Sequence, residues 1–184
     1  RIGEWPRGEG AYAAPRGFIQ VTPETLNTPV STHFELKDFL TKGQEGVWPK
    51  YVVLSTRLLD KLELTIQELE AMGYPVEDVF VVSGFRTPWY NARGGDPRGR
   101  GAMSRHMYGD ASDIAIDNDG DACMDDLNGD GRVDVEDARI IVAAAERVEA
   151  KHPDLVGGIG LYRPSPGAHC GMVHIDTRGY RARW

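Results

Sequence analysis

Residues 104–116 read SRHMYGDASDIAI, a stretch that joins a histidine, a glycine and a run of strand-forming residues. His106 and Asp113 are seven positions apart, and Gly109 lies between them. If the chain turns at this glycine and continues as a strand over residues 110–116, both side chains can reach one point. Neutral imidazole and carboxylate are suitable zinc ligands, and a second imidazole would leave a fourth position for water. The same spacing also fits a surface histidine beside an unrelated carboxylate, because two ligands do not define a metal site.

A third candidate ligand, His174, lies in another predicted strand, GMVHIDT at residues 171–177. Side chains two positions apart on a strand point to the same face, so His174 and Asp176 are expected on one side of the sheet. His106, Asp113 and His174 together are therefore the candidate ligands of a zinc site with three protein ligands.

Hydrophobic periodicity predicts a mixture of helices and strands. The clearest helix is expected at residues 57–72, where leucine and isoleucine recur on one face, with Ser55 placed to cap its start and Gly73 to end it. The elements expected elsewhere are a helical turn at 35–40, a helix at 135–151, and strands at 17–21, 29–34, 78–84, 110–116, 157–162 and 171–177, with a long loop from the end of 78–84 to about Ser104. Because these elements follow no regular alternation, we expect an α+β fold with an antiparallel sheet flanked by helices.

The composition suits one globular domain, since 41% of the 184 residues are hydrophobic. Residues 1–30 are interpreted as a mostly irregular N-terminal extension and residues 117–137 as an insertion, and no internal repeat is expected. The absence of a basic stripe argues against nucleic acid as a partner. No apolar run approaches the roughly 18 residues that span a bilayer. The chain begins at Arg1, which indicates a processed or trimmed form, and a monomer is expected.

Acidic residues are concentrated at 117–137, where the chain reads DNDGDACMDDLNGDGRVDVED. The formal net charge is -7, and the rest of the chain is nearly neutral, so this acidity indicates a local cation. Residues 126–137 match a twelve-residue calcium loop with Gly131 at its turn position, and a predicted helix follows. The expected calcium ligands are Asp126, Asn128, Asp130, Arg132 through its carbonyl oxygen, Asp134 and Asp137. A solvated acidic loop is the alternative.

Two features beside this loop leave alternatives open. Asp117, Asp119 and Asp121 repeat the alternation of oxygen ligands without a following helix, so they either help to hold a second ion or extend the acidic rim. Cys123 and Cys170 would pair in an oxidising compartment and remain two thiols in a reducing one.

Three stretches, SGFRTPWYN (83–91), SRHMYGDASD (104–113) and MVHIDT (172–177), resemble in this order the motifs of the zinc peptidase family that contains D-Ala-D-Ala carboxypeptidases and murein endopeptidases. The ending MVHIDTRGYRARW is similar to that of a bacterial murein endopeptidase subgroup, and the resemblance covers about residues 30–184. It implies zinc held by the three candidate ligands and the compact fold shared by hedgehog signalling domains and D-alanyl-D-alanine peptidases.

The resemblance also implies catalytic residues. Arg86 matches the family arginine that steadies the substrate or the developing oxyanion, although a structural salt bridge is the alternative role. The positions at which relatives carry a general base are Gly171 and Met172 here. The remaining candidates are His169, Asp176 or a residue from elsewhere in the chain. His169 is also interpretable as an exposed loop residue, and Asp176 as a carboxylate that orients a metal ligand.

The function expected from this resemblance is that of a zinc metallopeptidase hydrolysing D-amino-acid-containing peptides of bacterial peptidoglycan, as a carboxypeptidase or an endopeptidase. Such an enzyme would be periplasmic or secreted, would carry structural calcium, and would have Cys123 and Cys170 joined in a disulfide. One alternative is a non-catalytic, hedgehog-like module that binds zinc and calcium and recognises cell-wall peptides. A calcium-dependent interaction module of dockerin type is less favoured, because such modules use a pair of loops.

Overall fold

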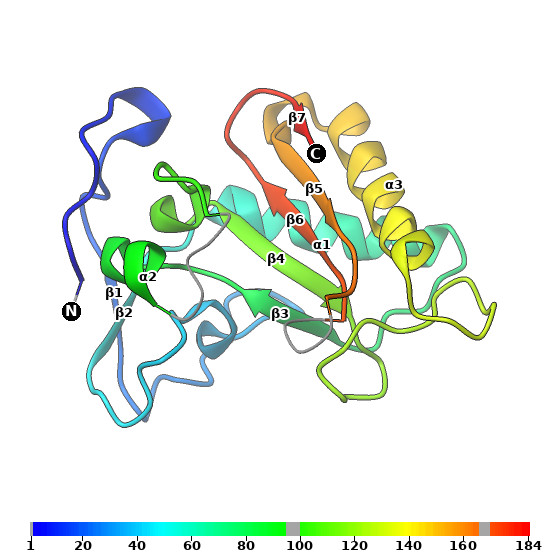
Figure 1. Ribbon diagram of the computed structural model, residues 1–184, viewed down its shortest axis with the longest axis horizontal. Coiled ribbons are helices and arrows are strands. Elements are labelled where there is room, and N and C mark those ends of the chain that lie inside the picture. Colours follow the sequence, from blue (N-terminus) through cyan, green and yellow to red (C-terminus); the bar gives the residue numbers. More distant parts are fainter. Residues whose placement is uncertain (1, 95–99, 166–169) are drawn as a thin grey trace.

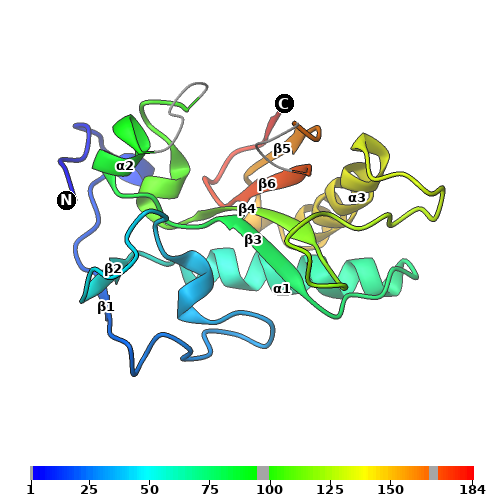
Figure 2. The ribbon, with the colours of Figure 1, turned by 60° about the horizontal axis from the view of Figure 1, so that its bottom comes forward.

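A five-stranded sheet with helices on one face forms the centre of the molecule (Figures 1 and 2). The computed structural model describes residues 2–94, 100–165 and 170–184. In spatial order the strands of this sheet are β3 (Val79–Ser83), β4 (Ala111–Ile116), β6 (Met172–Asp176), β5 (Gly158–Tyr162) and β7 (Ala182–Arg183). Neighbouring strands are antiparallel except β5 and β7, which are parallel. The mixture of helices with a mostly antiparallel sheet agrees with the α+β expectation.

Within the described residues, three α-helices and four short 3-10 helices accompany the sheet. The α-helices are α1 (Thr56–Ala71), α2 (Pro88–Arg93) and α3 (Val135–Lys151). The 3-10 helices are η1 (Gly10–Tyr12), η2 (Leu36–Phe39), η3 (Arg105–Tyr108) and η4 (Pro153–Leu155). No helix in the described part of the chain has both the length and the apolar character that a bilayer crossing requires.

The two faces of the sheet differ in chemistry because strand side chains alternate. In β4 and β6, Ile114 and Val173 point to one face and belong to the core cluster, together with apolar side chains of α1 and α3. Their chain neighbours Asp113 and His174, which form the next cross-strand pair, point to the opposite face. α1 and α3 thus cover the apolar face. Asp113 and His174 lie on the other face, away from these helices.

The segment before α1 departs most from expectation. The strand expected at 29–34 is absent, and an isolated bridge between Pro29 and Glu35 closes a turn there instead. β1 (Ile19–Val21) pairs with β2 (Lys50–Val52), a strand that the pattern did not predict. Strands of three residues are too short to show a clear alternation, so their pairing is decided by contacts distant in sequence.

Two regions expected to be irregular are ordered by specific contacts. The loop expected after β3 contains α2, which begins with Pro88 after Thr87, and the Thr87 hydroxyl oxygen accepts the Tyr90 backbone N–H. The first residues of the chain lie across η3, because the Trp5 indole N–H donates to the Met107 carbonyl and an Arg105 guanidinium N–H donates to the Ala11 carbonyl. The N-terminal extension is therefore packed against the segment that carries His106.

A buried ion pair joins the two long helices to the sheet. The Lys61 ammonium of α1 is completely buried and donates to the Glu149 carboxylate of α3 at 2.7 Å and to the Asp176 carbonyl oxygen at 2.8 Å. Glu149 also accepts bonds from the Gly157 backbone N–H and from the Arg183 guanidinium. Burial lowers the pKa of Lys61, and the Glu149 carboxylate opposes this shift.

Replacing Lys61 should destabilise the fold far more than replacing an exposed lysine in a similar pair. Lys61→Met leaves the Glu149 carboxylate buried without one of its cationic partners, which typically costs about 3–5 kcal/mol. Lys151 provides a matched control, because it also pairs across α1 and α3, with Glu68, but its side chain is 60% exposed. Lys151→Met should change the free energy of unfolding by about 1 kcal/mol or less.

Urea unfolding of the two variants and the parent protein measures this difference. Equal losses of stability in Lys61→Met and Lys151→Met would show that the buried pair has no special role.

Candidate metal centre

A row of four residues crosses four neighbouring strands on the polar face of the sheet. Ser83 of β3 pairs with Asp113 of β4, Asp113 with His174 of β6, and His174 with Gly160 of β5. Directly paired residues of antiparallel strands place their side chains on the same face. The pairing therefore brings the predicted ligands Asp113 and His174 together, although they are far apart in the chain.

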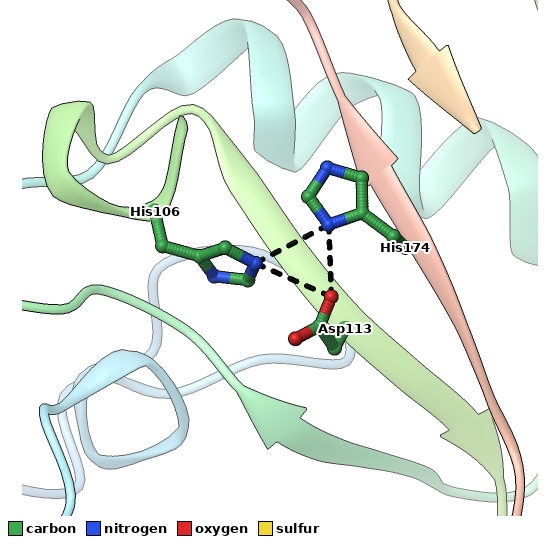
Figure 3. A group of neighbouring side chains, drawn as sticks. All are labelled: His106, Asp113 and His174. Atoms are coloured by element: carbon green, nitrogen blue, oxygen red, sulfur yellow. Dashed lines mark hydrogen bonds and ion pairs between the residues drawn. The ribbon is translucent and has the colours of Figure 1, made fainter. Parts of the chain in front are cut away.

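The third predicted ligand, His106, reaches the row from η3. Gly109 follows this helix with φ 71°, a left-handed conformation that favours glycine, and the chain then enters β4. The turn that the sequence required between His106 and Asp113 is thus present. Figure 3 shows the three side chains pointing toward one another.

The three donor atoms are close enough to share one metal ion. His106 Nε2 lies 3.2 Å from Asp113 Oδ1 and 3.2 Å from His174 Nδ1, and His174 Nδ1 lies 2.8 Å from Asp113 Oδ1. Ligand atoms bound to a tetrahedral zinc ion at about 2.0–2.1 Å lie about 3.3 Å from one another. Two imidazole nitrogens and one carboxylate oxygen are also a ligand set that zinc accepts in catalytic sites.

Bonds on the outer side of each ring determine which nitrogen faces the centre. His106 Nδ1 lies 2.7 Å from the Gly84 carbonyl oxygen, to which it must donate a proton. His174 Nε2 lies 2.9 Å from Asp176 Oδ2 and donates to it in the same way. With these protons placed outside, the lone pairs of the inner nitrogens face the Asp113 carboxylate. A proton or a metal cation must therefore lie among the three inner atoms.

The pKa shifts agree with this arrangement. Burial by itself would raise the pKa of Asp113, but the imidazole of His106 and the bonds to both histidines hold it well below its usual value. Burial lowers the pKa of His106. Burial would also lower the pKa of His174, but the carboxylates of Asp113 and Asp176 raise it. Asp113 is thus ionised, as metal ligation requires, whereas protons on the histidines compete with a metal.

Arg86 lies beside the group and holds its carboxylate. One Nη2–H donates to Asp113 Oδ2 at 2.7 Å and the Nε–H donates to the Ser83 hydroxyl at 2.8 Å. The side chain is only 14% exposed. This contact directs Oδ1 of Asp113 toward the two histidines. Of the two roles considered for Arg86, the salt bridge is the one directly visible, and its guanidinium also lies next to the centre.

The two candidate general bases have different positions. Asp176 is completely buried, and its oxygens accept bonds from His174 Nε2, from the Gly158 backbone N–H and from Arg178. It therefore lies on the side of the His174 ring away from Asp113. This geometry favours the role of a carboxylate that orients a metal ligand. His169, the other candidate, lies outside the described residues.

The predicted calcium loop, residues 126–137, has its side-chain oxygens bonded to its own backbone. Asp126 accepts the N–H groups of Gly129, Asp130 and Gly131, and Asn128 accepts that of Asp130. Asp137 accepts backbone N–H bonds through both oxygens and forms a capping box with Asp134 at the start of α3.

The carboxylates of residues 126–137 do not cluster around one point in the structure. Among the described residues, two sets of three acidic or histidine ligand atoms lie within 4.8 Å of one another. One is the zinc candidate, and the other consists of Asp117, Asp119 and Asp125. The capping box explains why the last predicted calcium ligand, Asp137, is held at the helix end rather than among the other acidic side chains.

The acidic segment contains two consecutive loops of similar geometry, in line with the repeated alternation of oxygen ligands in its sequence. Residues 117–125 (DNDGDACMD) and 126–134 (DLNGDGRVD) share a set of bonds from side-chain oxygens to backbone N–H groups. In each copy the first aspartate accepts the N–H groups of the fourth, fifth and sixth residues. The sixth residue has a positive φ in both, 63° at Ala122 and 83° at Gly131.

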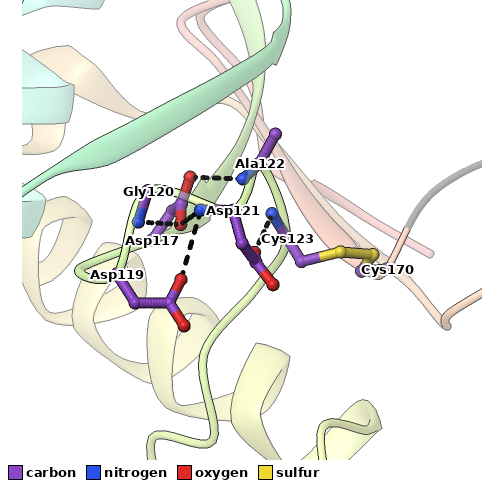
Figure 4. The surroundings of a disulfide bond; sticks show 7 residues. All are labelled: Asp117, Asp119, Gly120, Asp121, Ala122, Cys123 and Cys170. Atoms are coloured by element: carbon purple, nitrogen blue, oxygen red, sulfur yellow. Dashed lines mark hydrogen bonds between the residues drawn. A yellow bond between two sulfur atoms is a disulfide. The ribbon is translucent and has the colours of Figure 1, made fainter.

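A disulfide joins this segment to the strand that carries His174. Cys123 and Cys170 are bonded, and Cys170 lies two residues before β6 (Figure 4). Both cysteines of the chain are thus paired, as expected. A disulfide is compatible with an extracytoplasmic location, because reducing compartments keep thiols free.

Comparisons of the chain with protein-family models, with curated proteins and with solved structures found no match. The family resemblance of the three motifs therefore remains an expectation. The convergence of His106, Asp113 and His174 on one point is seen directly in their distances and hydrogen bonds.

His106→Ala and His174→Ala should each lose zinc while keeping the fold, because two remaining ligands do not hold zinc firmly. His33→Ala is the matched control, since His33 bonds Glu63 at 2.7 Å and is not part of the centre. Zinc content after dialysis, with circular dichroism to check folding, makes the comparison. Full zinc content in either site variant would contradict the assignment.

Asp176→Asn should weaken zinc binding without removing any ligand. An amide replaces the carboxylate that accepts the His174 Nε2 proton, and loss of such a partner typically costs about 10–100-fold in metal affinity. Competition with a chromophoric chelator gives the dissociation constant. An affinity equal to that of the parent protein would mean that Asp176 serves only the fold.

Proposed function

We propose that this chain is a zinc-dependent peptidase that hydrolyses D-amino-acid-containing peptides of bacterial peptidoglycan outside the cytoplasm. The observation that carries the zinc assignment is the convergence of His106 Nε2, His174 Nδ1 and Asp113 Oδ1, with outer bonds that turn their lone pairs inward. The resemblance of the surrounding motifs supports the substrate class. The disulfide is compatible with the location.

The residues around the centre have distinct tasks in this proposal. Zinc bound there would polarise a peptide carbonyl and lower the pKa of a bound water. Asp176 keeps His174 in the tautomer that presents Nδ1. Arg86 holds Asp113 and places a positive charge beside the centre, where it would favour negative charge developing on the substrate. A general base is not assigned among the described residues, and His169 remains a prediction.

A non-catalytic zinc module with the same fold is the second candidate. One observation favours it: the side chains of His106, Asp113 and His174 are only 3%, 4% and 6% exposed. Such burial suits a metal with a purely structural role, because little of the ligand set is open to a substrate. Peptide hydrolysis separates the two candidates.

Incubation with purified muropeptides tests the proposed function. The zinc-loaded protein should release peptide fragments that mass spectrometry identifies. A chelator should stop the reaction, and added zinc should restore it. His174→Ala is the control for contaminating activity. Metal-dependent binding of muropeptides without cleavage would favour the non-catalytic module.

We also propose that calcium is the ion of the acidic segment, held by the loop of residues 126–137. Nine acidic residues crowd into residues 117–137 with one arginine, and a cation relieves their repulsion. Asp126, Asn128 and Asp130 have the spacing of calcium-loop ligands. Calcium would stabilise the start of α3 and the end of β4 rather than take part in the reaction.

Calcium should raise the melting temperature of chelator-treated protein. At a hundredfold excess over its dissociation constant, an ion that binds only the folded state adds about 2.7 kcal/mol. For a domain of this size, such a gain corresponds to about 5–10 °C. Asp130→Ala should abolish the increase, whereas Asp60→Ala, an exposed carboxylate on α1, should retain it. A melting temperature insensitive to calcium would leave the segment a solvated loop.

A further inference from the structure

One exposed aromatic side chain adjoins the buried metal centre. The indole of Trp184 lies against the ring of His174, with ring centroids 5.1 Å apart and planes inclined by 45°. Trp184 is 49% exposed, whereas the side chain of His174 is only 6% exposed. A molecule that approaches the metal centre from this side would therefore meet the indole first.

The indole is held in place from several directions. Its Nε1–H donates to the Tyr162 hydroxyl at 2.8 Å, and the Trp184 carbonyl oxygen accepts the Leu161 backbone N–H at 2.9 Å. Gly160 lies beneath the ring, where a Cβ atom would come within 2.4 Å of the indole. Because Gly160 is also the cross-strand neighbour of His174, the missing side chain makes the space that the indole occupies.

The Arg178 guanidinium lies near the Trp184 ring, but its charge is already paired. The central carbon of the Arg178 guanidinium is 5.3 Å from the Trp184 ring centroid. The same guanidinium donates to both oxygens of Asp176, which in turn accepts the His174 proton. The charge of Arg178 is thus paired, and the indole N–H is already used by Tyr162. What remains exposed is a flat, apolar and rigid surface beside a metal ligand.

We propose that Trp184 is a substrate-contacting wall of the metal centre, which packs against an uncharged aliphatic residue of the peptide next to the bond to be cleaved. The inference rests on the proposed function. A rigid aromatic surface gains contact energy with little further loss of conformational entropy. Since the exposed surface has no unpaired charge or donor, it favours an aliphatic side chain over a charged or polar one.

Steady-state kinetics with one purified muropeptide tests this role. Trp184→Ala should raise KM at least tenfold and change kcat less than about threefold, with zinc content equal to that of the parent protein. Tyr180→Ala is the matched control, because Tyr180 is 52% exposed and lies 5.6 Å from Arg178, as Trp184 does at 5.3 Å, but it has no ring contact with His174 among the described residues. Its KM should stay within about twofold of the parent value.

A binding measurement provides a readout independent of turnover and of how well Trp184→Ala folds. In a protein with Trp5, Trp48 and Trp89 replaced by phenylalanine, Trp184 is the remaining indole of the chain. Titration of this zinc-depleted protein with the same muropeptide should shift the Trp184 emission in a saturable way. An emission that does not respond overturns the inference.

The outcomes separate this inference from the function on which it rests. A zinc-loaded parent protein that cleaves no muropeptide contradicts the proposed function. Cleavage by the parent protein with an unchanged KM in Trp184→Ala overturns the role of Trp184 alone. A KM raised equally in Trp184→Ala and Tyr180→Ala also overturns it, because the effect would then come from Arg178 rather than from the indole.

Discussion

A carboxylate oxygen and two imidazole lone pairs meet in the interior of this protein, and a cation must lie among them. The surrounding residues hold these three side chains in the orientation that brings their donor atoms together. Gly84 accepts the outer proton of His106, Asp176 accepts that of His174, and Arg86 binds the outer oxygen of Asp113. Each ligand is thus oriented by a bond on its far side, which reduces the freedom that a metal would otherwise have to remove.

The same bonds connect the centre to the framework of the fold. Asp176 orients His174 through its side chain, and its carbonyl oxygen accepts a bond from the buried Lys61 ammonium. Lys61 pairs with Glu149, so α1, α3 and β6 share one network of charges. Buried charges are costly unless they are paired, and the complete pairing here holds the helices in one position relative to the strand that carries His174.

The acidic segment is connected to the centre through the chain rather than through contact. Its first loop begins where β4 ends, four residues after Asp113. The disulfide from Cys123 reaches Cys170, just before β6. A cation that orders this segment would therefore act on both strands that supply ligands, at the ends away from His106.

The turn at Gly109 and the two long amphipathic helices of this protein could be predicted from the sequence. Gly109 between His106 and Asp113 indicated the turn into β4, and the hydrophobic periodicity of residues 135–151 predicted α3 with its observed bounds. These predictions succeeded because turns and amphipathic helices depend on residues a few positions apart. The mutual approach of His106, Asp113 and His174 was expected from motifs, and the strand pairing supplied the distances.

Only the tertiary structure decided what lies around those ligands. The bond of Arg86 to Asp113 and the contact of Trp184 with His174 depend on strand register and on loops that return from elsewhere in the chain. No local pattern encodes such contacts, because their partners are brought together by the packing of the whole sheet. The wrong strand at 29–34 has the same cause: three-residue strands take their pairing from distant neighbours.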